Sequence, residues 1–341
     1  MLSRIPPQTL RILALLFVLV AVLLFFSTQV PNYLNGRLFN RISSSVAIMA
    51  LIACGQTLVI LTRNIDLSIG SVVGFVAFAT GSLITHSPDI PPLVLAAYSI
   101  LLGACFGVVN GFFVAYARVP SIIVTLGTMA LFRSALVEYS DAKSITTNNL
   151  PTWLVEFPNT QLFTIGTFQF RAASVVAILV VIAVHITLSR VRPARKLYAV
   201  GSNPEAAEMS GINSKLVIFF AFVLAGALAG LAGFMFLARF GTITVVAGLG
   251  FELKSVAAAV VGGVNIFGGS GSVIGALIGT VLIDLIDMSL VRWQLVSEFW
   301  REAVLGSLIL LSVAADAILM RRLVKWRVSR EKKDATLEVQ A

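Results

Sequence analysis

Charged residues are scarce in this chain of 341 residues, at 12% of the total, whereas a soluble domain carries roughly 25%. Hydrophobic residues make up 58%, and the mean hydropathy is +0.95. A single soluble core cannot bury this much apolar sequence, so the scarcity of charge excludes a soluble globular protein. The composition predicts an all-α polytopic membrane protein, because every backbone polar group in lipid must be satisfied within the chain.

Cysteine and histidine are also scarce, with two residues of each. Cys54 and Cys105 lie in apolar runs, which argues against a disulfide framework. His86 and His185 lie far apart, and no stretch has the spacing of metal ligands. The glycine-rich stretch 267–275 is not followed by Lys-Ser or Lys-Thr, so it is not a phosphate-binding P-loop. We therefore predict no catalytic residue, no bound metal or cofactor, and no ATP hydrolysis by the chain itself.

Ten apolar segments are long enough to cross about 30 Å of hydrocarbon. They cover 11–27, 45–62, 70–86, 93–117, 121–138, 172–190, 215–238, 253–267, 272–290 and 300–320, and some are short enough to be tilted or broken. The first follows two arginines as in a signal peptide, but no small-x-small cleavage motif follows it, which favours an uncleaved first span.

The net charge of +9 does not indicate nucleic-acid binding, because the basic residues gather at span ends and in the tail. Most of them lie on the side of the N-terminus, so the positive-inside rule predicts that both termini are cytoplasmic. The chain then divides into a cytoplasmic N-terminus (1–10), a transmembrane domain (11–320) and a basic cytoplasmic tail (321–341). The longest outer segment, 139–171, is either a plain connector or a docking surface.

A short water-soluble helix is predicted in the long cytoplasmic loop 191–214, in the stretch "GSNPEAAEMSGI". Asn203 can cap its N-terminus, Pro204 suits the first helical position and Glu205 complements the helix dipole. Gly211 can take the left-handed C-terminal position. A helix this short is unstable alone in water, so we expect something to dock against it.

Two stretches resemble each other, "NIDLSIGSVVG" (64–74) and "NIFGGSGSVIG" (265–275). Each joins the end of one apolar span to the start of the next, and the topology places both on the cytoplasmic side. Either the repeat is parallel or a span is broken, and "GTITVVAGLGF" (241–251) could hide a half-helix; chance similarity among small residues is the third explanation. Small residues also recur every four positions, as at Gly103, Gly107 and Gly111, which indicates closely packed helices.

Polar residues within or near the spans are the candidates for a translocation path, because such groups in a membrane face a cavity or a partner. The candidates are Asn64, Asp66, Asn110, Thr125, Thr128 and Asn265. For Asp66 a local role competes with the functional one, since "NIDLSIGS" can be a capped helix start at Ser68.

Four motifs resemble the membrane subunits of ribose-type sugar ABC importers, which include arabinose, galactose, xylose, rhamnose and autoinducer-2 permeases. They are "NIDLSIGSVVG", "VNGFFVAYARVPSIIVTLGTMALFRS" (109–134), "YAVGSNPEAAEMSGI" (198–212) and "GFELKSVAAAVVGGVNIFGGSGSVIGALIG" (250–279). The residues Arg63 and Asn64, where many members carry glycines, look like the rhamnose or autoinducer-2 branches.

The resemblance implies an importer of a monosaccharide or related polyol-like solute in the bacterial inner membrane, working by alternating access. It implies a second permease subunit, identical or related, a periplasmic sugar-binding protein, and a separate ATPase with two nucleotide-binding domains that uses ATP and Mg. By match to the family's loop, the helix that couples to this ATPase would comprise Asn203, Pro204, Glu205, Ala206, Ala207, Glu208, Met209, Ser210 and Gly211. The alternative is a proton-coupled secondary transporter that uses Asp284 or Asp287 as a relay.

Overall fold

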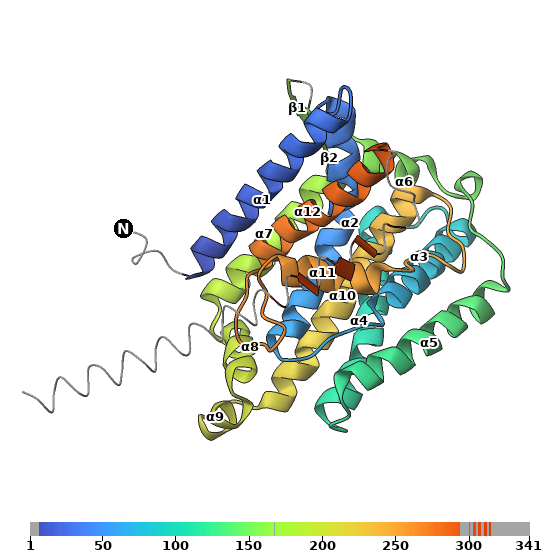
Figure 1. The fold of residues 1–341 in the computed structure, drawn as a ribbon. Coiled ribbons are helices and arrows are strands. Elements are labelled where there is room, and N and C mark those ends of the chain that lie inside the picture. Colours follow the sequence, from blue (N-terminus) through green and yellow to red (C-terminus); the bar gives the residue numbers. More distant parts are fainter. Residues whose placement is uncertain are drawn as a thin grey trace, which may run out of the picture.

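The computed structural model describes residues 7–166 and 168–293, with scattered residues between 300 and 314. These residues form a helical bundle with a small hairpin at one end and two short helices, α8 and α9, at the other (Figure 1). The long helices are α1 (Pro7–Gln29), α2 (Gly36–Leu61), α3 (Ile69–His86), α4 (Pro92–Ala115), α5 (Ser121–Ser140), α7 (Ala172–Arg190), α10 (Ser214–Phe240) and α12 (Val273–Trp293).

These eight helices are the candidate membrane spans within the described residues, and they confirm a polytopic α-helical membrane protein. The predicted span 253–267 is wrong as a full span, because helix α11 covers only Phe251–Val261. Eleven residues rise about 16 Å, roughly half the hydrocarbon thickness. The predicted span 300–320 and the tail 321–341 lie outside the continuously described residues.

Helix α2 occupies the centre of the bundle, where α10, α12, α7 and α11 pack around it. In its most apolar stretch 94% of the residues are buried, against 11% for α1, which lies on one flank along α12 (Figure 1). A helix that is apolar on all sides is stable when protein surrounds it. The sequence of α2 therefore fits a core helix, and that of α1 fits a helix facing lipid.

Helices α4 and α10 touch backbone to backbone along a row of glycines, as the small-residue spacing predicts. A Cβ on Gly103 would lie 2.3 Å from the carbonyl oxygen of Gly226, and one on Gly107 would lie 2.3 Å from that of Phe222. Helices α11 and α12 meet in the same way, with a Cβ on Gly275 only 2.1 Å from the Gly262 oxygen. No side chain larger than hydrogen fits at these crossings.

The segment 139–171 forms a compact cap at the end of the bundle opposite α8 and α9 (Figure 1). It contains η2 (Thr147–Asn149), α6 (Thr152–Glu156), η3 (Phe157–Asn159) and an antiparallel hairpin of β1 (Gln161–Ile165) with β2 (Phe168–Arg171). The side chain of Asn40 on α2 holds the hairpin through Gln169, at 3.1 Å between Nδ2 and Oε1. Apolar side chains of β1, including Leu162 and Ile165, are exposed.

Three of the non-helical segments between helices, the interruptions 62–68, 241–250 and 262–272, are held by contacts to other parts of the bundle. The stretch 241–251 does not hide a half-helix, because it is non-helical up to Gly250; the half-helix is α11, which starts next. Arg133 of α5 donates from one guanidinium nitrogen to the carbonyls of Val245 (2.9 Å) and Ala247 (2.6 Å). Unwound backbone inside a membrane protein needs hydrogen-bond partners, and an arginine from a neighbouring span supplies donors to its carbonyls here.

Candidate functional site

The short helix α9 (Pro204–Met209) forms as the sequence predicts. The side-chain oxygen of Asn203 accepts from the Ala206 amide at 3.1 Å, and Pro204 occupies the first helical position. Gly211 has φ +77° and closes the C-terminal end, where its amide donates to the Glu208 carbonyl at 2.9 Å. Both ends are satisfied locally, which makes this six-residue helix a defined element.

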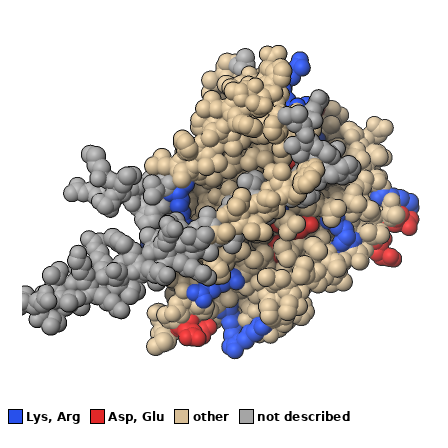
Figure 2. Space-filling view, in the orientation of Figure 1, with Lys and Arg blue, Asp and Glu red and all other residues tan. Residues whose placement is uncertain are grey.

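Helix α9 presents most of its surface to the outside and buries only Ala207. Glu205 and Glu208 are exposed, and Met209 is 90% exposed, more than any other large apolar side chain of the described residues. In Figure 2 acidic side chains gather at the lower left, where Figure 1 places α9, beside basic ones. A flexible apolar side chain next to two carboxylates is a surface suited to a protein partner.

Helix α8 (Arg192–Ser202) attaches α9 to the bundle. Leu197 is buried among side chains of α2, α7 and α10, and Val200 is also buried. The Tyr198 hydroxyl donates to the carbonyl of Gly271 at 3.2 Å, and burial raises the pKa of this phenol, which keeps it a neutral donor. The last residues of α8 thus lie against the segment 262–272.

The junction of α8 and α9 is clamped between two of the interruptions. Arg63, in the turn after α2, donates from its guanidinium to the carbonyls of Gly201 and Ser202. A Cβ on Gly201 would lie 1.7 Å from the carbonyl oxygen of Leu61, and the Gly269 amide donates to that same oxygen at 3.0 Å. The turn after α2 and the segment 262–272 therefore meet at one end of the bundle, and both touch the base of α9.

Three of the predicted path residues form one buried network. The Asp66 Oδ1 accepts from the amide (2.9 Å) and hydroxyl (2.7 Å) of Ser68, whose hydroxyl accepts from Asn110 at 2.8 Å. Asn110 in turn accepts from the Thr128 hydroxyl at 2.7 Å. All four side chains are buried, so the network joins the start of α3 to α4 and α5. Part of the local role considered for Asp66 is thus present: its carboxylate shapes the turn before α3, but the side chain of Ser68, at the N-cap position, makes no capping hydrogen bond.

Thr125 lies beside this network and donates to the carbonyl of Ile65 at 3.3 Å. The amide of Gln56, which sequence analysis did not single out, pairs with the backbone N–H and carbonyl of Asp66 at 3.2 and 3.1 Å. Asn64 and Asn265 lie outside the network, because Asn64 donates to the Thr62 carbonyl and Asn265 accepts from the Phe267 amide. The structure therefore brings together four of the six candidates.

Sequence reasoning missed the roles of Arg63, Arg133 and Gly201. For the two arginines, the only hint in the sequence of a structural role was their position within or at the end of an apolar span. Nothing in the sequence indicated that Gly201 makes a close backbone contact. The two acidic residues of α12 are also placed by the structure: Asp287 pairs with Lys254 at 3.0 Å, whereas the buried Oδ2 of Asp284 has no partner among the described residues.

The described residues define a multi-pass α-helical membrane protein, with a capped helix at one end that is bound to two helix interruptions. Comparison with known proteins identifies the class: residues 38–313 match the family described as "Branched-chain amino acid transport system / permease component". The chain belongs to this family. It is a permease component of an ABC-type import system and a multi-pass protein of the inner membrane.

The chain is similar to permeases named "Autoinducer 2 import system permease protein LsrC". It is 34% identical to that of Yersinia enterocolitica serotype O:8 / biotype 1B over 301 residues, which cover 88% of this chain and 81% of the relative. The protein of Escherichia coli O9:H4 is 34% identical over 282 residues, covering 83% and 79%, and that of Salmonella typhi is 34% identical over 301 residues, covering 87% and 83%.

Proposed function

We propose that this permease carries a monosaccharide or a related small polyol-like solute into the cell by alternating access, driven by a separate ATPase. The names of the similar permeases specify autoinducer 2, which makes it the first solute to test. The observation that carries the mechanism is the clamp at the α8–α9 junction, where Arg63 binds the carbonyls of Gly201 and Ser202.

The clamp supports a coupling role because it joins the exposed helix to parts of the bundle that can rearrange. A partner that moves α9 would pull on the turn after α2 through Arg63, and on the segment 262–272 through Tyr198. Interrupted helices whose backbone lines a cavity are typical of the moving parts of transporters. In this proposal α9, with the flanking Ser210 and Gly211, is the coupling helix of the loop 191–214.

The proposed topology has both termini in the cytoplasm, which places α8 and α9 on the cytoplasmic side. The partners are an ATPase with two nucleotide-binding domains that uses ATP and Mg, a second permease, identical or related, and a periplasmic solute-binding protein. We assign the docking of the binding protein to the segment 139–171, at the opposite end of the bundle, where β1 exposes apolar side chains. This chain binds no cofactor in the proposal.

The proposed path uses the hydroxyl and amide groups near the turn 62–68. Asp66, Asn110, Thr125 and Thr128 are buried and bonded to neighbouring groups, so they contact a solute only after this turn has moved. Asn64 and Asn265 lie at the two turns that touch the α8–α9 junction, so they complete the proposed path on the side of the ATPase. A path that opens only when α9 is displaced is consistent with import that depends on ATP.

The double substitution Glu205→Arg with Glu208→Arg tests the coupling helix. Both carboxylates are exposed, so the change leaves insertion and folding intact and weakens association with the ATPase. Reversing two exposed charges in an interface costs on the order of several kcal/mol when each faces a complementary group. Recovery of the ATPase with the affinity-purified permease, together with solute uptake, measures the effect.

The control is Glu138→Arg with Glu156→Arg, a second exposed pair at the other end of the bundle, which leaves recovery of the ATPase unchanged. Normal ATPase recovery and normal uptake in the Glu205/Glu208 variant would remove the coupling assignment. Proton-driven transport is separated by a second readout: it is abolished by an uncoupler and survives depletion of ATP, whereas the proposed importer behaves in the opposite way.

A further inference from the structure

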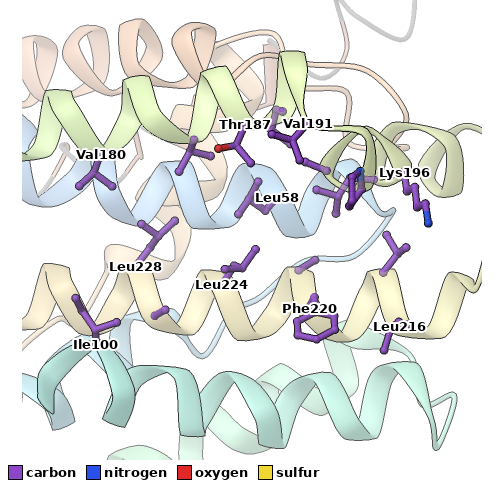
Figure 3. A pocket seen from close by; sticks show the side chains of 18 of the residues that line it. Leu58, Ile100, Val180, Thr187, Val191, Lys196, Leu216, Phe220, Leu224 and Leu228 are labelled. Atoms are coloured by element: carbon purple, nitrogen blue, oxygen red, sulfur yellow. The ribbon is translucent and has the colours of Figure 1, made fainter. Parts of the chain in front are cut away.

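An apolar groove runs along the bundle between α7, α8 and α10. Its cavity of about 700 Å³ is closed at the back by Leu58 of α2 and Ile100 of α4. Figure 3 shows side chains from these helices pointing into the same space, with Ile100, Val180 and Leu228 at one end and Lys196 and Leu216 at the other. The groove therefore lies lengthwise along the helices and ends at α8.

The groove is open along one side. Leu216, Phe220 and Leu224 of α10 line it and are 44%, 51% and 49% exposed, and Val191 at the end of α7 is 43% exposed. In a membrane-spanning bundle such a surface faces hydrocarbon. A long, narrow apolar space of this kind is suited to a hydrocarbon chain, which fills irregular space by rotating about its bonds.

Polar groups occur only near the end at α8. The Thr187 hydroxyl donates to the Ala183 carbonyl at 2.8 Å, and the Asn213 side chain accepts from the Leu216 amide at 3.1 Å, so both are satisfied locally. Lys196 is different: within the described residues it has no hydrogen bond and no ion pair. The groove thus has a long apolar part and a single available charge at its end.

Lys196 belongs to a basic surface on α8. Arg192 lies four residues before it, on the same face of the helix, and both side chains are exposed. The apolar residues Leu197 and Val200 of α8 are buried against the bundle, whereas these two basic side chains stay exposed. Since α8 begins directly after the membrane-spanning helix α7, its basic face lies at the level of the lipid headgroups, where lysine and arginine attract anionic lipids.

We propose that this groove binds an anionic phospholipid, with one acyl chain along α7 and α10 and the phosphate between Lys196 and Arg192. A phospholipid matches both parts of the site at once, an apolar body and an anionic head. A second copy of the chain would match the apolar part but would leave the charge of Lys196 without an anionic partner. Because α8 forms the end of the groove, the bound lipid stabilises α8 in the position from which it holds α9.

The test is native mass spectrometry of the full permease in mild detergent, with phosphatidylglycerol or phosphatidylcholine of identical acyl chains. We expect a bound lipid that survives gentle activation and a preference for phosphatidylglycerol. Lys196→Gln lowers this preference about fivefold, because one basic residue near an anionic headgroup contributes about that factor. The control Lys143→Gln, at the exposed outer segment, leaves the preference unchanged.

A second pair of variants tests the apolar part. Leu224→Trp fills the groove and reduces retention of both lipids, whereas Leu179→Trp, on an exposed part of α7 outside the groove, does not. Equal retention in these two variants, or equal binding of the two headgroups by the unmodified protein, would overturn the proposal. A third result would also overturn it: the unmodified permease forms a dimer through this groove, and Leu224→Trp dissociates the dimer while lipid binding persists. The measurement needs no ATPase, so it stands apart from the test of the coupling helix.

Discussion

The turns 62–68 and 262–272 belong to similar sequences, and each leads into a long helix, but they are built by different chemistry. In the first, the side chains of Asp66 and Ser68 form the turn, with bonds that extend to Asn110. In the second, the position equivalent to Ser68 is Gly269, which has φ +72°, and its neighbour Gly268 has φ +81°. One turn is held by polar side chains, the other by backbone that only glycine adopts easily.

The difference shows which part of the repeated sequence is required by the backbone geometry. Both sequences keep a glycine at the later equivalent position, Gly74 and Gly275, where a Cβ would lie 2.3 Å from the Ala247 oxygen and 2.1 Å from the Gly262 oxygen. Backbone contact is therefore required after both turns. The polar network is required only at the first, where α4 and α5 approach the turn. This asymmetry makes the first turn the more suitable one for contact with a solute.

Gly201→Ala disrupts the close backbone contact that holds the two turns together, so we expect it to have the largest effect. Its methyl group would lie 1.7 Å from the Leu61 oxygen, which also accepts from Gly269. Overpacking typically costs about 1–3 kcal/mol, and a backbone contact this close belongs at the upper end or beyond. The measurement is the yield of folded protein and its thermal unfolding in detergent.

The matched control is Gly127→Ala on α5, where no atom lies within 4 Å of the added Cβ. In a helix this change is neutral or slightly stabilising. If Gly201→Ala unfolded at the same temperature as the control, the two turns would not depend on the α8–α9 junction.

A reciprocal exchange between the turns has the next largest effect. Gly269→Ser places a side chain at φ +72° and within 2.7 Å of the Ser202 backbone, at a cost of about 2 kcal/mol or more. Ser68→Gly, at an ordinary φ of −81°, removes hydrogen bonds only and costs roughly 1–2 kcal/mol. Thermal unfolding of both variants compares the two losses of stability, and we expect the larger loss in Gly269→Ser. A larger loss in Ser68→Gly would mean that the second turn relaxes away from its glycine geometry.

The elements that rest on local sequence were predictable. The cap of α9 required only Asn203, Pro204 and Gly211, whose interactions lie within a few residues. The turn at Asp66 was recognisable as a possible cap for the same reason. Glycine spacing also predicted close helix packing, since four-residue periodicity places small residues on one face.

The elements that rest on distant contacts were not predictable. The half-helix α11 was read as a full span, because its apolar sequence continues through the turn that ends it at Gly262. Arg133 holds carbonyls more than one hundred residues away, and Arg63 reaches across to Gly201. Hydropathy records neither the place where a span breaks nor the donor that satisfies the exposed backbone, because both depend on the packed arrangement.

Thr128→Val is the smallest of these changes and the most informative about the first turn. It replaces the hydroxyl that donates to Asn110 with a methyl group of similar size, and losing such a bond costs about 1 kcal/mol. The control is Thr280→Val on α12, whose hydroxyl donates to the Ala276 carbonyl of its own helix, outside the network. If the network only holds the turn, both variants lose stability and transport in proportion. If it also contacts the solute, Thr128→Val lowers uptake per folded permease well beyond the control. The reason is that the Thr128 hydroxyl, which donates to Asn110 in this structure, would donate to the solute when the turn opens, and valine has no hydroxyl.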